Sequence, residues 1–350
     1  MRVKLGDVCE RGTSNLKQSD VIEMNEGYPI YGASGYIGKA NFYHQEQSYV
    51  AVVKDGAGIG RTMLCPAKSS LIGTMQYLLP KENIIPEYLF YVVSYMHLEK
   101  YFTGATIPHI YFKDYKNEEF NLDSLEKQAE IVKTLGKCEK IIASRKQEIQ
   151  LLDKLVKARF VEMFGDPVNN QHGYEKVCLS ELADIKIGPF GSLLHKEDYI
   201  EGGHPLINPS HIIDGKVAPD NKLSISDEKY NELLAYQLHI GDVVMGRRGE
   251  MGRCAVVPDE GYLCGTGSLM IRTKGDVTAD YIQKVISFPS FKKTIEDMAV
   301  GQTMPNLNVP IVSSFQVIKP PIEVQNRYYA VVAQVNKSKI VIETECQFCT

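Results

Sequence analysis

The sequence predicts an α+β fold: two similar α/β domains joined by long helices that form an antiparallel coiled coil, with pseudo-two-fold symmetry. Three observations predict it. The chain has 350 residues, more than one average domain needs. Its two halves repeat one succession of motifs, and two segments carry apolar residues at the three-four spacing of an amphipathic helix. The expected boundaries are 1–120 and 167–319 for the domains, 121–166 for a central spacer and 320–350 for a C-terminal helix.

The repeat can be followed along both halves. Each opens with a short strand pattern, VKLGDVCERGTS in the first and VCLSELADIKIGPFGS in the second. Gly60 then matches Gly252, 192 residues later. Both follow an apolar run and lie in a predicted turn that contains glycines and basic residues. A helical pattern comes next, IPEYLFYVVSY or TADYIQKVISF. Gln128 finally matches Gln325, 197 residues later. Because these offsets are nearly constant, the two halves are predicted to be an internal duplication of one fold.

A glycine-threonine-proline loop also occurs twice, as GATIPHI from Gly104 and as GQTMPNLNVP from Gly301. Glycine and proline make these strings poor helix material, and they are too polar for a core strand. We expect them to form the same corner of each domain, shortly before the chain enters a helix.

The connector from Asp123 to Phe164 predicts one long helix, because apolar residues recur at three-four spacing and Lys, Glu and Arg fill the positions between them. Gly165 and Pro167 end it. A second, shorter helix is expected after Pro321. In the alternative, each helix packs only on its own domain. The seam that would pair the two helices consists of Val132, Leu135, Ile142, Ile149, Leu152, Val156, Val331 and Val335.

Composition is that of a globular protein with a core, since 44% of residues are hydrophobic and 23% are charged. No apolar run is long enough to span a membrane, and the N-terminus lacks the apolar region of a signal peptide. We therefore expect a cytoplasmic protein whose eight cysteines are reduced thiols. The CQFC string at Cys346 lacks two further ligands for a zinc site, so no metal is expected.

Motifs of covalent chemistry are missing from the sequence. VAVVKDGAGIGR places glycines after a strand pattern, but Arg61 stands at the sixth position of the dinucleotide-binding fingerprint and no helix pattern follows. INPSHI from Ile207 lacks the second proline and the aromatic residue of the adenine methyltransferase motif. We predict a tight hairpin turn at Gly56, no catalytic residue and no cofactor in this chain. A nucleotide-binding oxidoreductase built on the Gly56 turn is the enzyme alternative.

Polar glycine-rich loops remain as candidate binding elements, although the charge balance does not favour nucleic acid. The formal net charge is −4, with 12 basic and 13 acidic residues in 1–120 and 14 basic and 19 acidic residues in 174–318. DNA binding would therefore require a segregated basic face on each domain. For any one of these loops, a solvated charged turn is the alternative.

Longer strings carry a family resemblance. GPFGSLLHKEDYIEGGHPLINPSHIIDG from Gly188, YPIYGASGYIG from Tyr28 and RFVEMFGDP from Arg159 combine with the twice-occurring loop and with the Glu-x-Gln helix starts at Glu126 and Glu323. In this order, and over essentially the whole chain, they closely resemble the specificity subunit of type I restriction-modification systems. The first string is similar to the opening of that family's target recognition domain, and the second to its alternative form.

The resemblance implies two target recognition domains, each of which reads one half of a bipartite target in double-stranded DNA, with helices that fix the half-site spacing. It implies two methyltransferase subunits that bind these helices and use S-adenosylmethionine, and motor-nuclease restriction subunits that use ATP and Mg²⁺. The specificity subunit itself is non-catalytic. The candidate DNA-binding residues are Ser34, Lys39, Lys54, Arg61, Thr106, His109, Ser192, His195, Lys196, Arg247, Arg248, Arg253, Gln302, Thr303 and Asn306.

The residues alone leave two alternative functions open. The first is a coiled-coil adaptor that does not contact DNA. The second is a specificity protein that dimerises or that serves a methylation-only system without the nuclease subunits.

Overall fold

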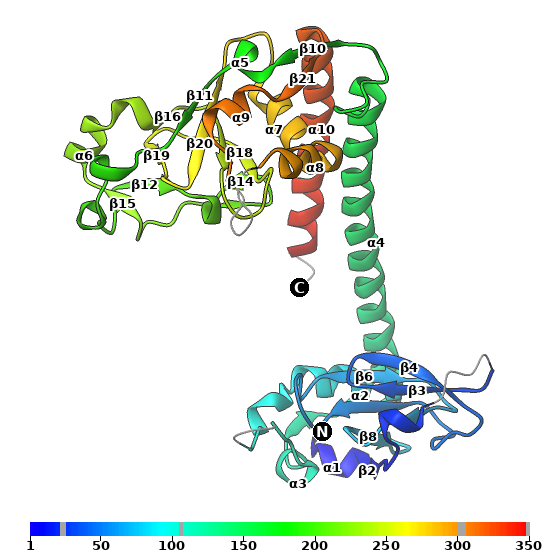
Figure 1. Ribbon diagram of the computed structural model, residues 1–350. Coiled ribbons are helices and arrows are strands. Elements are labelled where there is room, and N and C mark those ends of the chain that lie inside the picture. The colour runs from blue at the N-terminus through cyan, green and yellow to red at the C-terminus, as the bar shows by residue number, and fades with distance from the viewer. Residues whose placement is uncertain (22–25, 105–107, 300–305, 348–350) are drawn as a thin grey trace. The chain divides into compact units, whose positions relative to one another are not determined.

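The computed structural model of the protein describes residues 1–21, 26–104, 108–299 and 306–347, without the side chains of residues 20 and 345–347. The chain divides into two compact units, Met1–Ser144 and Arg145–Phe348 (Figure 1). The long helix α4 begins in the first unit and ends in the second.

Unit 1 builds mainly on strands. Its elements are β1 (Arg2–Lys4), α1 (Leu5–Val8), β2 (Cys9–Thr13), η1 (Gln18–Asp20), β3 (Tyr28–Gly32), β4 (Gly35–Ala40), β5 (Tyr49–Val53), β6 (Thr62–Cys65), β7 (Ser70–Leu71), β8 (Met75–Pro80), α2 (Pro86–Tyr95), η2 (Leu98–Tyr101), α3 (Phe112–Tyr115), β9 (Glu119–Asn121) and the start of α4 (Leu125–Phe164).

Unit 2 repeats this order with insertions. Its elements are the end of α4, β10 (Glu175–Cys178), α5 (Leu179–Leu182), β11 (Ala183–Ile187), η3 (Gly191–Leu193), η4 (Lys196–Asp198), β12 (His204–Ile207), η5 (Pro209–His211), β13 (Ile212–Ile213), β14 (Lys216–Val217), β15 (Ser224–Ile225), α6 (Asp227–Glu232), η6 (Leu234–Tyr236), β16 (Gln237–Leu238), β17 (Val243–Gly246), β18 (Cys254–Val256), β19 (Tyr262–Cys264), β20 (Ser268–Thr273), α7 (Ala279–Ser287), α8 (Pro289–Met298), α9 (Val309–Ser313), β21 (Gln316–Lys319) and α10 (Ile322–Gln347).

The strand pairings establish the duplication. A central four-stranded sheet has the order β2-β8-β5-β6 in unit 1 and β11-β20-β17-β18 in unit 2. A smaller outer sheet contains one parallel pair in each unit, β3 with β7 and β12 with β19. The first and last strands of each unit form a separate ribbon, β1 with β9 and β10 with β21. The predicted repeat is therefore confirmed strand by strand.

Burial explains why the central strands are apolar throughout. All five residues of β5 are buried. Val50 and Val52 pack in the core beneath α2, whereas Tyr49, Ala51 and Val53 pack against the outer sheet. A strand covered on both faces needs apolar residues at every position, which removes the alternation of a half-exposed strand. β17 is buried in the same way over its whole length.

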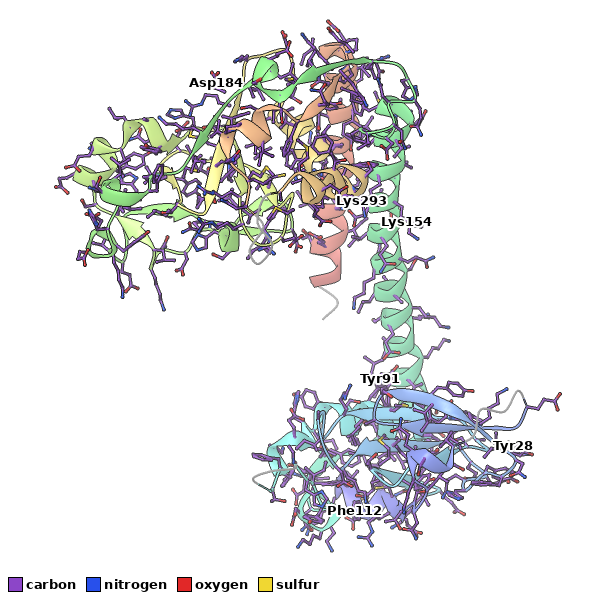
Figure 2. The ribbon with its side chains drawn as sticks, viewed as in Figure 1. Tyr28, Tyr91, Phe112, Lys154, Asp184 and Lys293 are labelled. Atoms are coloured by element: carbon purple, nitrogen blue, oxygen red, sulfur yellow. The ribbon has the colours of Figure 1, made fainter. Side chains whose placement is uncertain are left out.

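The predicted long helices are present as α4 and α10 (Figure 1). In unit 2 the two helices run antiparallel. The hydroxyl of Tyr328, near the start of α10, donates a hydrogen bond to Val156 O at 3.3 Å, whereas Lys339, further along α10, pairs with Asp153, which comes earlier in α4. Phe160 packs into the core of unit 2 with Tyr328. Lys154 is an exposed charged residue of α4 (Figure 2).

The predicted seam residues alternate with exposed apolar ones. Ile149, Leu152 and Val156 are half-buried, and on α10 Val331 is half-buried and Val335 is buried. In unit 1 the seam prediction is wrong for Val132, which packs against the core of that unit; Ile142 is half-buried and Leu135 is exposed. Exposed apolar side chains on the two helices of unit 2 include Leu151, Leu155, Ile340 and Val341.

Candidate nucleic-acid interface

The turn that follows β17 carries Arg247 and Arg248 on a fixed backbone. The Arg247 N–H donates to Gly267 O at 3.0 Å, and the Arg247 carbonyl accepts from Leu307 N at 2.9 Å. The Nε of Arg247 donates to Asn306 Oδ1 at 3.1 Å. Burial, and then the charge of Arg248, lower the pKa of Arg247. The turn thus presents two adjacent guanidinium groups, one of which is oriented by an asparagine.

Arg253 closes the same turn and braces it. Its Nε and Nη2 donate to Glu250 Oε2 at 3.1 and 2.6 Å, and its Nη1 donates to Pro209 O at 3.2 Å. Lys292 on α8 donates to Glu250 Oε1 at 3.2 Å. Hydrogen bonds from these two cations hold the pKa of Glu250 below its usual value. Arg253 therefore has an intramolecular role in the fold, and its contact with DNA stays a prediction.

The turn after β5 in unit 1 has the same scaffold. The Lys54 N–H donates to Thr74 O at 3.1 Å, and the Lys54 carbonyl accepts from Ile110 N at 2.9 Å. Lys54 thus stands where Arg247 stands in unit 2, and its two backbone partners come from the matching segments. The hairpin turn predicted at Gly56 joins β5 to β6.

The next position shows how the two turns differ. Asp55 forms an isolated antiparallel bridge with His109, and Arg248 forms the corresponding bridge with Asn306. In unit 1 the side chains make an ion pair, Asp55 Oδ1 with His109 Nδ1, and Lys54 Nζ lies 3.6 Å from Asp55 Oδ2. One scaffold therefore presents a carboxylate in unit 1 and a guanidinium in unit 2.

Glycine is required where each turn packs against a helix, η2 in unit 1 and α8 in unit 2. Gly60 has φ +81° and Gly252 has φ +74°, the left-handed region that favours glycine. A Cβ atom would lie 2.5 Å from Glu99 N at the first position and 2.7 Å from Lys292 Cγ at the second. The match between Gly60 and Gly252 thus reflects one close approach that occurs in both units.

A hollow of about 500 Å³ opens beside Asp55 in unit 1. Ser34, from the turn between β3 and β4, lines it together with Thr74 and with Asn15 and Gln18 from the loop after β2. Apolar residues such as Leu16, Ile37 and Ile72 complete the lining. The hollow brings Ser34 and Asp55 into one site although they belong to different sheets.

Other predicted residues of unit 1 lie near these turns. Arg61 is exposed, and its Nε and Nη2 lie 3.5 and 3.4 Å from Gly58 O and Ala57 O within its own turn. Lys39 is half-buried in β4.

In unit 2, Ser192, His195 and Lys196 are exposed on the loop that holds η3 and η4, which starts at the end of β11 as the loop of Asn15 starts at the end of β2. No hydrogen bond or ion pair joins this loop to Arg247 or Arg248 among the described residues. Three predicted residues lie outside the part of the chain that the structure describes: Thr106, Gln302 and Thr303.

Sequence reasoning missed Asp55, Asn15 and Gln18. An acidic residue in a glycine turn is most often a solvated loop residue, and only the strand pairing shows that Asp55 faces His109. The available signal was the internal alignment, which pairs the turn after β5 with the arginine turn after β17.

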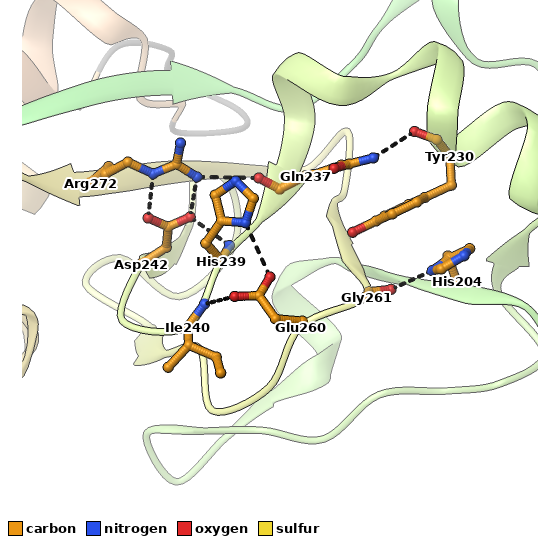
Figure 3. Close-up of polar contacts among 9 residues, drawn as sticks. All are labelled: His204, Tyr230, Gln237, His239, Ile240, Asp242, Glu260, Gly261 and Arg272. Carbon is orange, nitrogen blue, oxygen red and sulfur yellow. Dashed lines mark hydrogen bonds and ion pairs between the residues drawn. The ribbon is translucent and has the colours of Figure 1, made fainter.

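Away from the turns, a polar network supports β17. Arg272 binds Asp242 through two nitrogens, Nε to Oδ1 at 2.7 Å and Nη2 to Oδ2 at 2.6 Å (Figure 3). The hydrogen bond to Asp242 is the main reason why the pKa of Arg272 is raised. Asp242 also accepts from His239 N at 2.8 Å. Because Asp242 directly precedes β17, this pair anchors the strand whose other end carries Arg247.

The same network holds the outer sheet of unit 2. His204 stacks on Tyr230 with ring centroids 3.7 Å apart, and its Nδ1 lies 2.9 Å from Gly261 O (Figure 3). Glu260 accepts from Ile240 N at 3.0 Å. We assign these contacts to the scaffold, since they tie the β18–β19 turn to β12 and β16.

The described residues form neither a metal site nor a membrane-spanning helix. Among residues 1–21, 26–104, 108–299 and 306–347, no three His, Cys, Asp or Glu side chains are placed to hold a metal ion. The CQFC string falls outside the side chains that are described. Within the same ranges, none of the helices combines the length and the apolar character needed to cross a bilayer.

Comparison with solved structures agrees with this architecture. The S subunit of a type I restriction-modification system from M. genitalium superimposes with a TM-score of 0.62 at 14% identity, over 100% of this chain and 92% of that one. A chain from a structure on complex assembly and conformational transition of the type I R-M system gives a TM-score of 0.60 at 16% identity, over 100% and 94%. At these identities the likeness concerns the fold.

Sequence comparison identifies the family. The MjaVIII specificity subunit of a type I restriction enzyme from Methanocaldococcus jannaschii is 22% identical over 355 residues, covering 92% of this chain and 83% of the relative. The MjaIX specificity subunit from the same organism is 22% identical over 289 residues, covering 73% and 63%. The family model of the type I restriction modification DNA specificity domain matches residues 1–154 and 171–347. Because these two matches take in both duplicated units, the chain belongs to the family of type I restriction modification DNA specificity domains.

Proposed function

We propose that each unit binds one half of a two-part DNA sequence through the turn that follows its central strand. One observation carries the proposal. The two turns share the same backbone hydrogen bonds, from Ile110 N to Lys54 O in unit 1 and from Leu307 N to Arg247 O in unit 2, but they present different side chains. A scaffold kept constant while its exposed groups change is suited to reading two different sequences from one fold.

The side chains on these turns are of the kinds that read base edges. Arginine donates to guanine O6 and N7, and aspartate accepts from the amino group of cytosine in the major groove. Asn306 holds Arg247 through Nε, which reduces the rotamer freedom that an arginine loses on binding. Lys54 and Arg61 add cations in unit 1, where contacts with phosphates would position the duplex.

The two long helices would set the distance between the half-sites and carry the partner subunits. In DNA-binding dimers, the two-fold symmetry of the protein matches the arrangement of the two half-sites. Covalent duplication provides the same geometry in one chain. Exposed apolar side chains of the kind that partner proteins cover occur on the described part of both helices of unit 2: Leu151 and Leu155 on α4, and Ile340 and Val341 on α10.

These partners would be two methyltransferase subunits that use S-adenosylmethionine and, for restriction, motor-nuclease subunits that use ATP and Mg²⁺. The relatives from M. jannaschii are named as specificity subunits of type I restriction enzymes, so their names imply further subunits. In this assignment the chain itself is non-catalytic, holds no cofactor and acts in the cytoplasm.

Selection from a library of randomised DNA duplexes tests the proposal. The full chain, alone and with its methyltransferase subunit, is expected to enrich one motif of two short blocks separated by a fixed gap. The Arg247→Ala/Arg248→Ala double variant is expected to lose the block read by unit 2. If the chain co-purifies with a methyltransferase and yet enriches no motif, it is an adaptor and the proposal is wrong.

A further inference from the structure

The position after the fixed backbone residue differs in charge between the two units. Asp55 follows Lys54, and Arg248 follows Arg247, at corresponding places in the strand pairing. A carboxylate in one unit thus replaces a guanidinium in the other. Asp55 was not among the residues that the sequence pointed to.

Neighbouring side chains hold Asp55 in place, and its carboxylate is still accessible to a ligand from solvent. Its side chain is 20% exposed, with one carboxylate oxygen paired to His109 Nδ1 and the other 3.6 Å from Lys54 Nζ. It lines the hollow of about 500 Å³ with Ser34, Thr74 and Gln18. A carboxylate can accept about four hydrogen bonds, so the pairing with His109 leaves it acceptor capacity.

We propose that Asp55 and Arg248 are equivalent specificity-determining residues, and that Asp55 accepts a hydrogen bond from the amino group of a cytosine whereas Arg248 donates to a guanine. This inference rests on the proposed function and assigns the class of base that each unit reads. Arg248 is exposed, and no side-chain ion pair holds it within the described residues.

The chemistry makes the two residues mutually exclusive readers. An ionised carboxylate has no donor and repels the acceptors O6 and N7 of guanine. A guanidinium has five donors and no acceptor, so it matches guanine and not the amino edge of cytosine. Lys54 and His109 would offset the repulsion between Asp55 and the DNA backbone, since both place positive or donor groups on the carboxylate.

Duplex selection with the full chain tests the pair. The wild-type protein is expected to enrich a cytosine at one position of one block. Asp55→Asn, which adds donors and removes the charge, should reduce that preference by at least about fivefold, the discrimination of a single base contact. Asp55→Arg with His109→Asn should shift the position toward guanine. Asp114→Asn is the matched control, an exposed carboxylate of the same unit, and should change nothing.

The reciprocal variant protects the test against misfolding of the partly buried Asp55 variants. Arg248→Asp alters an exposed side chain and should convert a guanine preference to cytosine in the other block only. The inference is overturned if folded Asp55→Asn and Arg248→Asp both enrich the wild-type motif, because Asp55 then only orients His109. Failure of the wild-type chain to enrich any motif would instead overturn the proposed function, and the inference with it.

Discussion

Gln128 and Gln325 occupy the same buried position in the two units and share three contacts, to which Gln325 adds a fourth from Thr278 Oγ1. Gln128 Oε1 accepts from Ile85 N at 2.9 Å, and Gln325 Oε1 accepts from Thr278 N at 2.9 Å. The amide nitrogen of each donates to two backbone carbonyls. Both side chains are completely buried. Each glutamine thus ties the first turn of a long helix to the start of α2 or α7, which fixes the helix on its unit.

Gln325→Ala should destabilise unit 2. The change leaves Thr278 N and two carbonyls without a partner in a buried place, which costs about 1–3 kcal/mol for an unsatisfied group. Hydrogen exchange should report faster opening at the start of α7 and α10, with unit 1 unchanged. Gln147→Ala is the matched control, an exposed glutamine on α4. Equal protection in both variants would show that the buried amide does not hold the helix.

Glu118→Gln should weaken unit 1 in a pH-dependent manner. Hydrogen bonds from Lys100 and then from Tyr101, both at 2.5 Å, lower the pKa of Glu118. A carboxyl whose pKa is lower in the folded state stabilises the fold above its unfolded pKa of about 4.3, and the stabilisation is lost as the pH falls through the folded value. The loss in free energy of unfolding should therefore be largest near neutral pH and shrink in acid. Glu82→Gln, an exposed change in the same unit, should show no such trend.

Native-state alkylation should distinguish the cysteines by burial. Burial raises the pKa of Cys9, Cys65, Cys254 and Cys264 to about 12, so few of these thiols are the reactive thiolate at neutral pH. Iodoacetamide should therefore modify the half-buried Cys138 well before any of them. Mass spectrometry of a variant with serine at 346 and 349 provides the readout. Early labelling of Cys254 would contradict its placement in the core.

Much of the fold could be predicted from the sequence because the two halves carry the same residues at matching positions. The match of Gly60 with Gly252 and of Gln128 with Gln325 marks two places where only one residue type fits, a left-handed turn pressed on a helix and a buried triple hydrogen bond. α4 was predictable because its three-four pattern persists over its 40 residues.

The site could be predicted only in part, since long-range pairing decides it. Asp55 and His109 are 54 positions apart, and their bridge depends on how the segment before α3 returns to β5. Arg253 illustrates the reverse case. From the sequence, Arg253 was a candidate DNA-binding cation in a glycine-rich turn. In the structure its guanidinium pairs with Glu250. Local sequence does not determine which charges a protein neutralises within itself.

Arg247→Ala should weaken binding to the selected duplex and relax its block of the motif. Losing one well-oriented base contact costs about 1–3 kcal/mol, whereas a lost phosphate contact would weaken all sequences alike and lower the salt slope by about one. Asn306→Ala should have a smaller effect of the same kind, because it removes the contact that orients the guanidinium. Lys293→Ala, an exposed cation on α8 (Figure 2), is the control. Titrations over a salt series separate the cases, and unchanged affinity in Arg247→Ala would remove it from the interface.

Exchanging residues 174–318 for the corresponding unit of another family member should change one block of the motif and leave the other as it was. The ribbon of β10 (Glu175–Cys178) with β21 (Gln316–Lys319) brings both ends of this segment together, so the exchange cuts the chain at one place in the fold. Gln325 remains and contacts the new unit through backbone groups at the positions of Asp276 and Thr278, which do not depend on side-chain identity; only the bond from Thr278 Oγ1 does. Duplex selection, or mapping of methylated adenines with the methyltransferase present, gives the result. A change in both blocks would mean that the units do not read DNA independently, whereas the reciprocal exchange of residues 1–120 should alter only the block that the first exchange preserved.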